Sequence, residues 1–145
     1  MKVMLFFAAM LLSAAILYGQ EAADLKSAID SKDFEKAVQM IPQVIAKNQK
    51  DVLVHIMAGD VYLEMEKYNE AAIMFEKAVD LDKKNVDSWL KYGRSLAMSG
   101  KRKEALELLK DAQDRFEKNV HVLLEMANVY LTKESLTSED LTKAE

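Results

Sequence analysis

The sequence contains no cysteine, and this absence excludes several kinds of chemistry. Without a thiol there are no disulfides, thiolate zinc sites, Cys nucleophiles or lipid attachments through Cys. Glycine and proline are also scarce, with four Gly and one Pro in 145 residues. An all-β fold needs more turn residues, and an apolar content of 50% is too high for a disordered chain. The composition therefore predicts an all-α protein, either one domain or a short array of repeats.

Motifs for catalysis are missing as well. The sequence has no Gly-rich phosphate loop, no Gly-x-Ser-x-Gly turn and no His-Glu-x-x-His pair. Its two histidines, His55 and His121, lie far apart in the sequence and have no neighbours at ligand spacing. The basic cluster at 100–104, GKRKE, reads as a solvated turn rather than an anion site. We therefore predict a protein that is not an enzyme and has no cofactor and no metal site.

The N-terminal segment 1–19 is predicted to be a signal peptide. One Lys precedes an apolar run from Val3 to Tyr18 that only Ser13 interrupts. The alternative is an uncleaved membrane anchor, although this run is shorter than the roughly 20 apolar residues that cross a bilayer untilted. We expect an exported protein, periplasmic or secreted, that contacts a membrane only if this segment is retained.

The charge of the exported part argues against nucleic acid as a partner. Without residues 1–19 the chain has 19 Lys and Arg against 24 Asp and Glu, a net charge of −5. Proteins that bind nucleic acid neutralise phosphates with a basic surface.

A sequence repeat organises the rest of the chain. Lys-Asn-Val occurs at 84–86 and again at 118–120, and Lys-Asp-Val begins a similar stretch at 50–52, so the three starts are equally spaced. Residues 52–85 and 86–119 align with nine identities, and most of the shared small residues lie at helical spacing. Each unit contains two amphipathic segments with a short polar turn between them, so each is a predicted helical hairpin.

Small and polar residues mark the contacts and the ends of these predicted helices. Gly59 and Gly93 stand where two helix axes are expected to approach closely, opposite Ala71 and Ala105. Asp51, Asn85 and Asn119 directly precede first helices, where their side chains can accept hydrogen bonds from free backbone N–H groups. Such a cap typically contributes ~1 kcal/mol.

These residues resemble the tetratricopeptide repeat family. Its characteristic positions are matched in 52–85 by Gly59, Tyr62, Tyr68, Ala71, Phe75 and Ala78. In 86–119 they are matched by Trp89, Gly93, Gly100, Ala105, Leu109 and Ala112. The resemblance implies an α-solenoid of antiparallel hairpins that forms a right-handed superhelix, with the first helices lining a concave groove.

The outer units match less well. Residues 20–51 form a degenerate first hairpin with a weak first helix, and Pro42 predicts a kink in its second helix. Residues 120–145 form a partial or atypical repeat, in which a lengthened turn would place Leu141 and Ala144 at the start of a displaced second helix.

The resemblance also implies where a partner would bind. The groove-lining positions are occupied by Leu53, Ile56, Asp60, Leu63, Asp87, Leu90, Arg94, His121, Leu124 and Asn128. They predict an apolar stripe beside a polar one, suited to an extended or helical segment of another protein. The alternative is that Leu63, Leu124 and Leu131 belong to the core and that Asp60 pairs with Arg94.

The predicted function is therefore that of an exported adaptor or scaffold. Family members that clamp acidic C-termini of chaperones carry Lys, Asn and Arg at set groove positions, and here those positions are mostly apolar or acidic. We expect a bacterial periplasmic protein that binds a peptide or helix of a partner. The alternative is a membrane-tethered assembly or secretion factor held by residues 1–19.

Overall fold

The described part of the computed structural model, residues 20–117 and 119–131, is helical and contains no strand. Helical residues 20–30 come first. Six helices follow: α2 (Phe34–Lys47), α3 (Val52–Glu64), α4 (Tyr68–Leu81), α5 (Val86–Met98), α6 (Arg102–Arg115) and α7 (Val120–Leu131). Consecutive helices pack as antiparallel hairpins, so the predicted all-α solenoid is confirmed.

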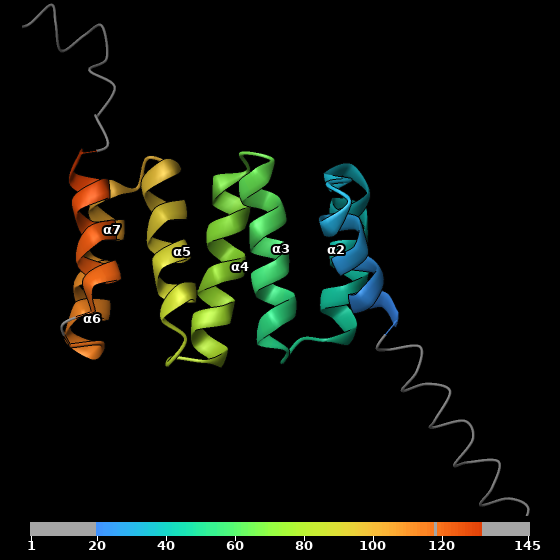
Figure 1. Cartoon of the computed structure of the whole chain (residues 1–145), viewed down its shortest axis with the longest axis horizontal. Coiled ribbons are helices and arrows are strands. Elements are labelled where there is room, and N and C mark those ends of the chain that lie inside the picture. Colours follow the sequence, from blue (N-terminus) through green and yellow to red (C-terminus); the bar gives the residue numbers. More distant parts are fainter. Residues whose placement is uncertain (1–19, 118, 132–145) are drawn as a thin grey trace, which may run out of the picture.

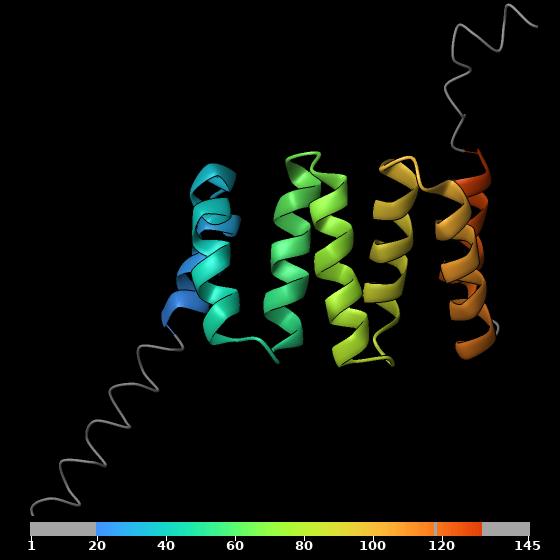
Figure 2. The same ribbon diagram turned by 180° about the vertical axis from the view of Figure 1, so that it is seen from behind.

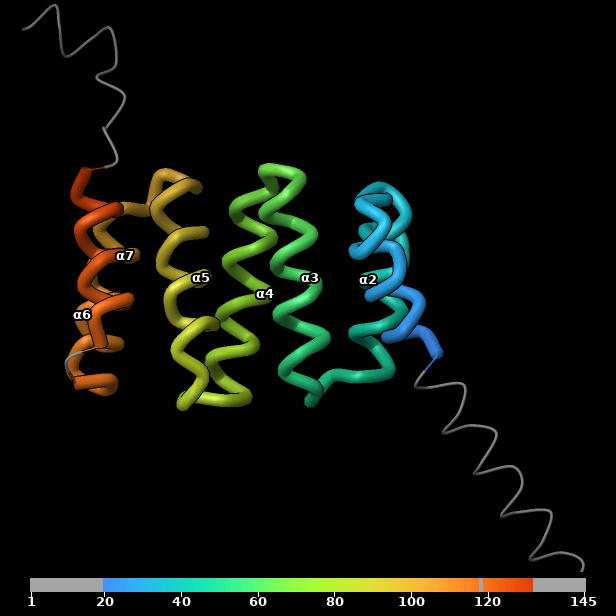
Figure 3. The backbone as a smooth tube through the Cα atoms, viewed as in Figure 1, coloured from blue at the N-terminus to red at the C-terminus, as the bar shows by residue number. Residues whose placement is uncertain are grey.

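The helices stand side by side in one row (Figure 1). Residues 20–30 and α2 form one end, and α6 and α7 form the other, where α7 lies in front of α6. The view from behind reverses this last order (Figure 2). The backbone trace shows that the first and last described residues lie at opposite ends of the row (Figure 3).

Two predictions fall on residues outside the described part of the chain. These are the signal peptide at 1–19 and the displaced second helix with Leu141 and Ala144. Within the described part, no helix combines the length and the apolar character needed to cross a membrane.

The three predicted caps are confirmed. The Asp51 carboxylate accepts a hydrogen bond from Leu53 N at 2.9 Å, and the Asn85 side chain accepts one from Ser88 N at 3.0 Å. Asn119 Oδ1 accepts one from His121 N at 3.0 Å. The same kind of contact therefore starts each first helix, and this explains why the short polar motif recurs in each repeat.

The two helical glycines permit close packing of each hairpin, and their nearest neighbours are large residues of the second helix. A Cβ built on Gly59 would lie 2.6 Å from the ring of Phe75, and one on Gly93 would lie 2.8 Å from the Leu109 side chain. Both neighbours are fully buried. Ala71 and Ala105 are also buried, and the glycines make room for the large residue one turn further along the second helix.

The first hairpin is built like the others. Leu25 and Ala28, from helical residues 20–30, share a buried cluster with Ile41 and Val44 of α2. Helix α2 runs through Pro42 without a break, and that residue is exposed. The proline therefore removes one backbone hydrogen bond on the solvent side while the opposite face stays in the core.

Near the start of α3 and of α5, one side chain also holds the preceding turn. Trp89 Nε1 donates to the carbonyl of Lys83 at 3.2 Å, and His55 Nε2 makes the same contact with the carbonyl of Gln49 at 3.0 Å. Each bond joins residues six apart, at equivalent places in the repeat. His55 Nδ1 is buried without a hydrogen-bond partner. The imidazole of His55 therefore makes the same contact with the preceding turn as the indole of Trp89, but its Nδ1 atom stays unsatisfied.

Candidate partner-binding surface

The predicted groove residues lie on the first helices α3, α5 and α7. Most are exposed: Leu53 (66%), Leu124 (56%), Asp87, Arg94, His121 and Asn128. The others are partly buried: Ile56, Asp60, Leu63 and Leu90. Leu90 also packs against the two core clusters beneath α5. The predicted apolar stripe is therefore uneven, because Leu90 belongs partly to the core.

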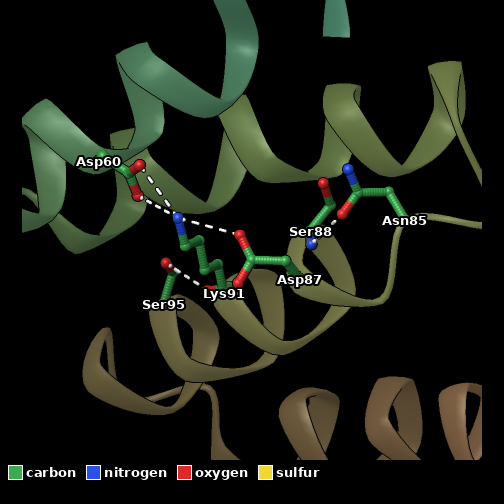
Figure 4. A network of polar contacts seen from close by, with 6 residues as sticks. All are labelled: Asp60, Asn85, Asp87, Ser88, Lys91 and Ser95. Atoms are coloured by element: carbon green, nitrogen blue, oxygen red, sulfur yellow. Dashed lines mark hydrogen bonds and ion pairs between the residues drawn. The ribbon is translucent and has the colours of Figure 1, made fainter. Parts of the chain in front are cut away.

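A charged cluster joins α3 to α5 on this surface. Lys91 Nζ lies 2.9 Å from Asp60 Oδ1 and 3.1 Å from Asp87 Oδ2. Figure 4 shows the lysine pointing between the two carboxylates, one from each helix. The same ammonium lies 5.8 Å from the centroid of the Phe75 ring, within range of a cation–π contact.

A second ion pair joins α5 to α7. Arg94 Nε donates to Glu125 Oε1 at 3.0 Å, and Nη2 donates to Oε2 at 2.7 Å. The Glu125 side chain is only 7% exposed, whereas that of Arg94 is 52% exposed. The fork of the guanidinium thus satisfies a buried carboxylate from the solvent side.

The two ion pairs follow the repeat. Each joins the ninth position of one first helix to the sixth position of the next, 31 residues later. The order of the charges is reversed between the two pairs. The ninth position holds the acid, Asp60, in the first pair and the base, Arg94, in the second. The interpretation that Asp60 pairs with Arg94 is wrong: equivalent positions of neighbouring helices are offset, so each charge meets the sixth position instead.

Sequence reasoning missed Lys91 and Glu125 as parts of this surface. A signal was available, because Asp60 with Lys91 and Arg94 with Glu125 are opposite charges at one fixed separation of 31 residues. A search for oppositely charged residues separated by 31 positions would have found both pairs.

Burial and charge shift the pKa values of both groups of the first pair. Desolvation raises the pKa of the Asp60 carboxyl, although the hydrogen bond and the charge of Lys91 act in the opposite direction. Burial lowers the pKa of Lys91, but its contacts with Asp60 and Asp87 outweigh this effect, so the pKa is raised. The bonds to Glu125 similarly raise the pKa of Arg94. The lysine and arginine thus remain cationic at neutral pH.

Two hollows open beside the ion pairs. One has a volume of ≈ 320 Å³ and reaches from Ile29 and Phe34 to Asp60, Leu63 and Glu64. The other, of ≈ 280 Å³, is lined by Arg94, Ala97, Met98, Glu125, Asn128 and Val129. Both contain the ninth, twelfth and thirteenth positions of a first helix. The first hollow lies between residues 29–34 and α3 and includes Asp60 but not Lys91, whereas the second lies between α5 and α7 and includes both partners of the second ion pair.

The alternative in which three leucines belong to the core is wrong for two of them. Leu124 is 56% exposed and Leu131 is 81% exposed within the described part of the chain. Leu63 is partly buried and lines the larger hollow. Both exposed leucines lie on α7.

The histidines do not form a metal site with their surroundings. Among the described residues, no group of three or more His, Asp and Glu side chains is arranged to hold a metal ion. His55 is buried at the anchor described above, and His121 is exposed on α7.

Comparison with known proteins identifies the fold. Residues 62–114 match the family model described as tetratricopeptide repeat. No curated protein matches the sequence.

Solved structures with the same fold include three complexes with peptides. The second tetratricopeptide domain of human RPAP3, in complex with an HSP70 peptide, has a TM-score of 0.68 at 20% identity and covers 79% of this chain and 93% of its own. The Yersinia enterocolitica type III secretion chaperone SycD, with a peptide of the translocator YopD, has a TM-score of 0.67 at 18% identity, covering 80% and 94%. The TPR2B domain of yeast Sti1 in a complex with pHsp70 has a TM-score of 0.67 at 14% identity, covering 80% and 98%.

At these identities the solved structures establish the fold, while the family model supplies a match in the sequence itself. That match spans the end of α3, all of α4 and α5, and most of α6. Residues 62–114 therefore match the tetratricopeptide repeat family model, and the helices on either side have the fold of the solved tetratricopeptide domains.

Proposed function

We propose that the protein is an exported, non-catalytic adaptor that binds a segment of another protein on the surface of α3, α5 and α7. The observation that carries this proposal is that two hollows open along the first helices, one beside Asp60 and one beside the ion pair of Arg94 and Glu125. A segment lying across the first helices would meet a hollow beside a charged side chain at two places. Such repetition suits an extended or helical peptide, whose side chains also recur at fixed intervals.

The charges of the surface indicate which segments fit. Lys91 is shared by Asp60 and Asp87, so this cluster has a net charge of −1. Arg94 is neutralised by Glu125. Neither cation is free for a carboxylate, and the exposed Asp87 favours a basic group. We infer that the ligand is a neutral or basic segment whose apolar side chains enter the hollows.

The solved complexes support the general mode of binding. RPAP3 and SycD, which share this fold, are seen with an HSP70 peptide and a YopD peptide. The ligand of this chain differs in our proposal, because an acidic tail would meet Asp60 and Asp87 rather than unpaired bases.

Selection from a peptide library tests this proposal. Residues 20–145 would be used as bait, and the affinity of the selected peptides would be measured for variants of the bait. Leu53→Glu and Asp87→Lys change exposed side chains of the proposed surface and are expected to weaken binding at least tenfold without loss of helicity. Ile73→Glu is the matched control, because Ile73 is 57% exposed on α4. Unchanged affinity in both surface variants, or a loss in the control alone, would contradict the proposed location.

Export is tested separately. The proposal rests on the apolar segment 1–19, and it predicts a mature chain that begins near Gln20 in the exported fraction. Mass spectrometry of the N-terminus in fractionated cells measures this directly. An intact N-terminus in the membrane fraction would favour the membrane-tethered assembly factor instead.

A further inference from the structure

The two hollows of the candidate surface differ in charge. The first, of ≈ 320 Å³, lies between residues 29–34 and α3, and the second, of ≈ 280 Å³, lies between α5 and α7. Pockets that hold a whole small molecule have volumes of about 300–1,000 Å³, so both hollows are near or below the lower limit. Each hollow is therefore suited to one side chain of a longer ligand.

The first hollow combines apolar walls with negative charge. Its lining includes three apolar residues, two acids and one base: Ile29, Phe34, Leu63, Asp60, Glu64 and Lys32. Asp60 and Glu64 are four residues apart on α3, so their side chains lie on the same side of the helix. The carboxylates outnumber the ammonium group, and an aromatic ring lies in the same hollow.

Glu64 is the carboxylate of this hollow that is open to a ligand. Both Asp60 oxygens are already bound, since they lie 2.9 Å and 3.0 Å from Lys91 Nζ (Figure 4). Glu64 is exposed, and no Lys, Arg or His side chain in the described part of the chain forms an ion pair with it. A cation that enters the first hollow would therefore meet an unpaired carboxylate.

The neighbouring carboxylates repel one another, and this also favours a cation. Burial raises the pKa of the Asp60 carboxyl, and the charges of Asp87 and Glu64 raise it further, against the opposite effect of Lys91. A positive charge placed beside Glu64 would reduce this repulsion. Lys32 lies in the same hollow and acts against a second cation, so its removal should strengthen the binding of one.

The second hollow has no charge to offer. Arg94 and Glu125 neutralise each other there through two hydrogen bonds. Its apolar lining includes Ala97, Val129 and Met98, which is 47% exposed. A charged group of a ligand would lose its hydration in this hollow without gaining an unpaired opposite charge. An apolar side chain is the better occupant.

We propose that the bound segment is recognised by two side chains, a basic one in the first hollow and a long apolar one in the second. This inference rests on the proposed function and names the residues that the surface selects. Lys and Arg match the first hollow because their apolar stem can pack on Phe34 and Leu63 while the charged head reaches Glu64. The ring of Phe34 also attracts a cation.

The positions of the hollows set the spacing of the two residues. The first hollow lies before α3 and the second lies after α5, so they are separated by two steps between first helices (Figure 1). Packed helices have axes about 8–10 Å apart, which gives roughly 16–20 Å for two steps. An extended chain advances about 3.3 Å per residue, so the basic and the apolar residue are about five or six positions apart.

The charged cluster between the hollows favours an extended segment over a helical one. Asp60, Lys91 and Asp87 lie on the path from one hollow to the other. An extended chain presents free backbone N–H and C=O groups that can bond to them, whereas the backbone groups in the middle of a helix are already paired. The exposed Asp87 carboxylate is the natural acceptor for such an N–H group.

The sequences of selected peptides give the first test. Peptides selected from a random library on the full chain are expected to carry Arg or Lys about five or six positions from Leu, Met or Phe. Three residues inserted between the pair should weaken binding at least about tenfold in fluorescence anisotropy, because only one side chain can then reach its hollow. The same insertion outside the pair is the control and should have no effect. Selected peptides without this pair, or a pair at helical spacing, would overturn the inference.

Charge reversal at Glu64 tests the first hollow. Glu64→Lys should weaken a selected peptide at least about tenfold, and replacing the basic residue of that peptide by Glu should restore binding to the variant. Lysine in the last turn of α3 suits the helix dipole, so the fold is kept. Glu107→Lys makes the same charge change at an exposed position of α6 and should have no effect. Equal losses in both variants, or no recovery with the acidic peptide, would contradict the assignment.

Lys32→Asn provides a test of opposite sign. Asparagine tolerates the positive φ of 57° at this residue, so the turn is kept. Removal of the ammonium group should strengthen the binding of a selected basic peptide by about twofold to fivefold. Weaker binding would show that Lys32 itself contacts the ligand, and the first hollow would then not select a basic residue.

Met98→Glu tests the second hollow and separates this inference from the proposed function. The variant should lose affinity for selected peptides, whereas Ile73→Glu on α4 should not. If peptides are weakened by Leu53→Glu and Asp87→Lys but ignore Glu64→Lys and Met98→Glu, the surface binds peptides and the two assigned hollows are wrong. If none of these four substitutions matters, the binding surface itself is wrong and the inference fails with it.

Discussion

The close packing at Gly59 gives the sharpest test of how the hairpins are held together. In Gly59→Ala the added methyl group would lie 2.6 Å from two atoms of the Phe75 ring and 2.9 Å from a third. Real side chains do not approach this closely, so the ring or α4 must move. Phe75 is fully buried, which leaves little room for the ring to rotate.

The expected size of the effect follows from two opposing terms. Overpacking of a core typically costs about 1–3 kcal/mol. Replacing glycine by alanine inside a helix returns about 1 kcal/mol. We therefore expect Gly59→Ala to lower the free energy of unfolding by up to roughly 2 kcal/mol. Thermal unfolding followed by circular dichroism would show a midpoint several degrees lower.

A double-mutant cycle tests the stated cause. Phe75→Leu removes the ring atoms that meet the new methyl group and copies the pairing of Gly93 with Leu109 in the next repeat. The cost of Gly59→Ala should therefore be smaller in the Phe75→Leu background by about 1 kcal/mol. An equal cost in both backgrounds would refute the reasoning, because the destabilisation would then not come from the ring.

Three further predictions concern charged and polar groups. Arg94→Met leaves the buried carboxylate of Glu125 unpaired and should lower the free energy of unfolding by about 3 kcal/mol, measured by chemical denaturation. Lys91→Met changes a more solvated cluster and should cost about 1 kcal/mol or less. Equal effects of the two substitutions would contradict the role given to burial. Burial, then the charge and hydrogen bond of a neighbouring carboxylate, raise the pKa of Tyr92 to about 12, so the stability it contributes is complete below its usual pKa of ~10 and is lost as the pH rises to about 12. Absorbance titration of tyrosinate should lose its last step in Tyr92→Phe, and loss of a step near pH 10 instead would count against this. His55→Trp removes the unsatisfied Nδ1 and should raise the midpoint of thermal unfolding. A lower midpoint would mean that the larger ring does not fit, and that the contacts of His55 and Trp89 with the preceding turns are not equivalent.

The repeat made most of the fold predictable. A constant period with small residues and caps at fixed places determines where each hairpin starts, and Asp51, Asn85 and Asn119 accept the expected hydrogen bonds. The contact of Gly59 with Phe75 was harder to foresee. It depends on the offset between two helices, which the spacing of residues within one helix does not reveal.

The polar contacts of the candidate site were predicted less well. Asp60 and Arg94 were placed on the right surface but were assigned to each other. The actual partners, Lys91 and Glu125, lie one helical turn earlier in the next repeat, because consecutive first helices are shifted and tilted relative to one another. Leu90 and Leu124 occupy the same position in successive repeats, yet Leu90 is partly buried and Leu124 is exposed. Whether a neighbouring helix covers this position is not encoded in the sequence of one repeat.

Chemical-shift mapping with a selected peptide tests the central claim most directly. The account predicts that a neutral or basic peptide perturbs the backbone amides around Asp60 and Arg94, on α3 and α5, and leaves the exposed residues of α4 near Ile73 unchanged. Perturbations confined to α4 and α6, or preference for acidic peptides over basic ones, would contradict it.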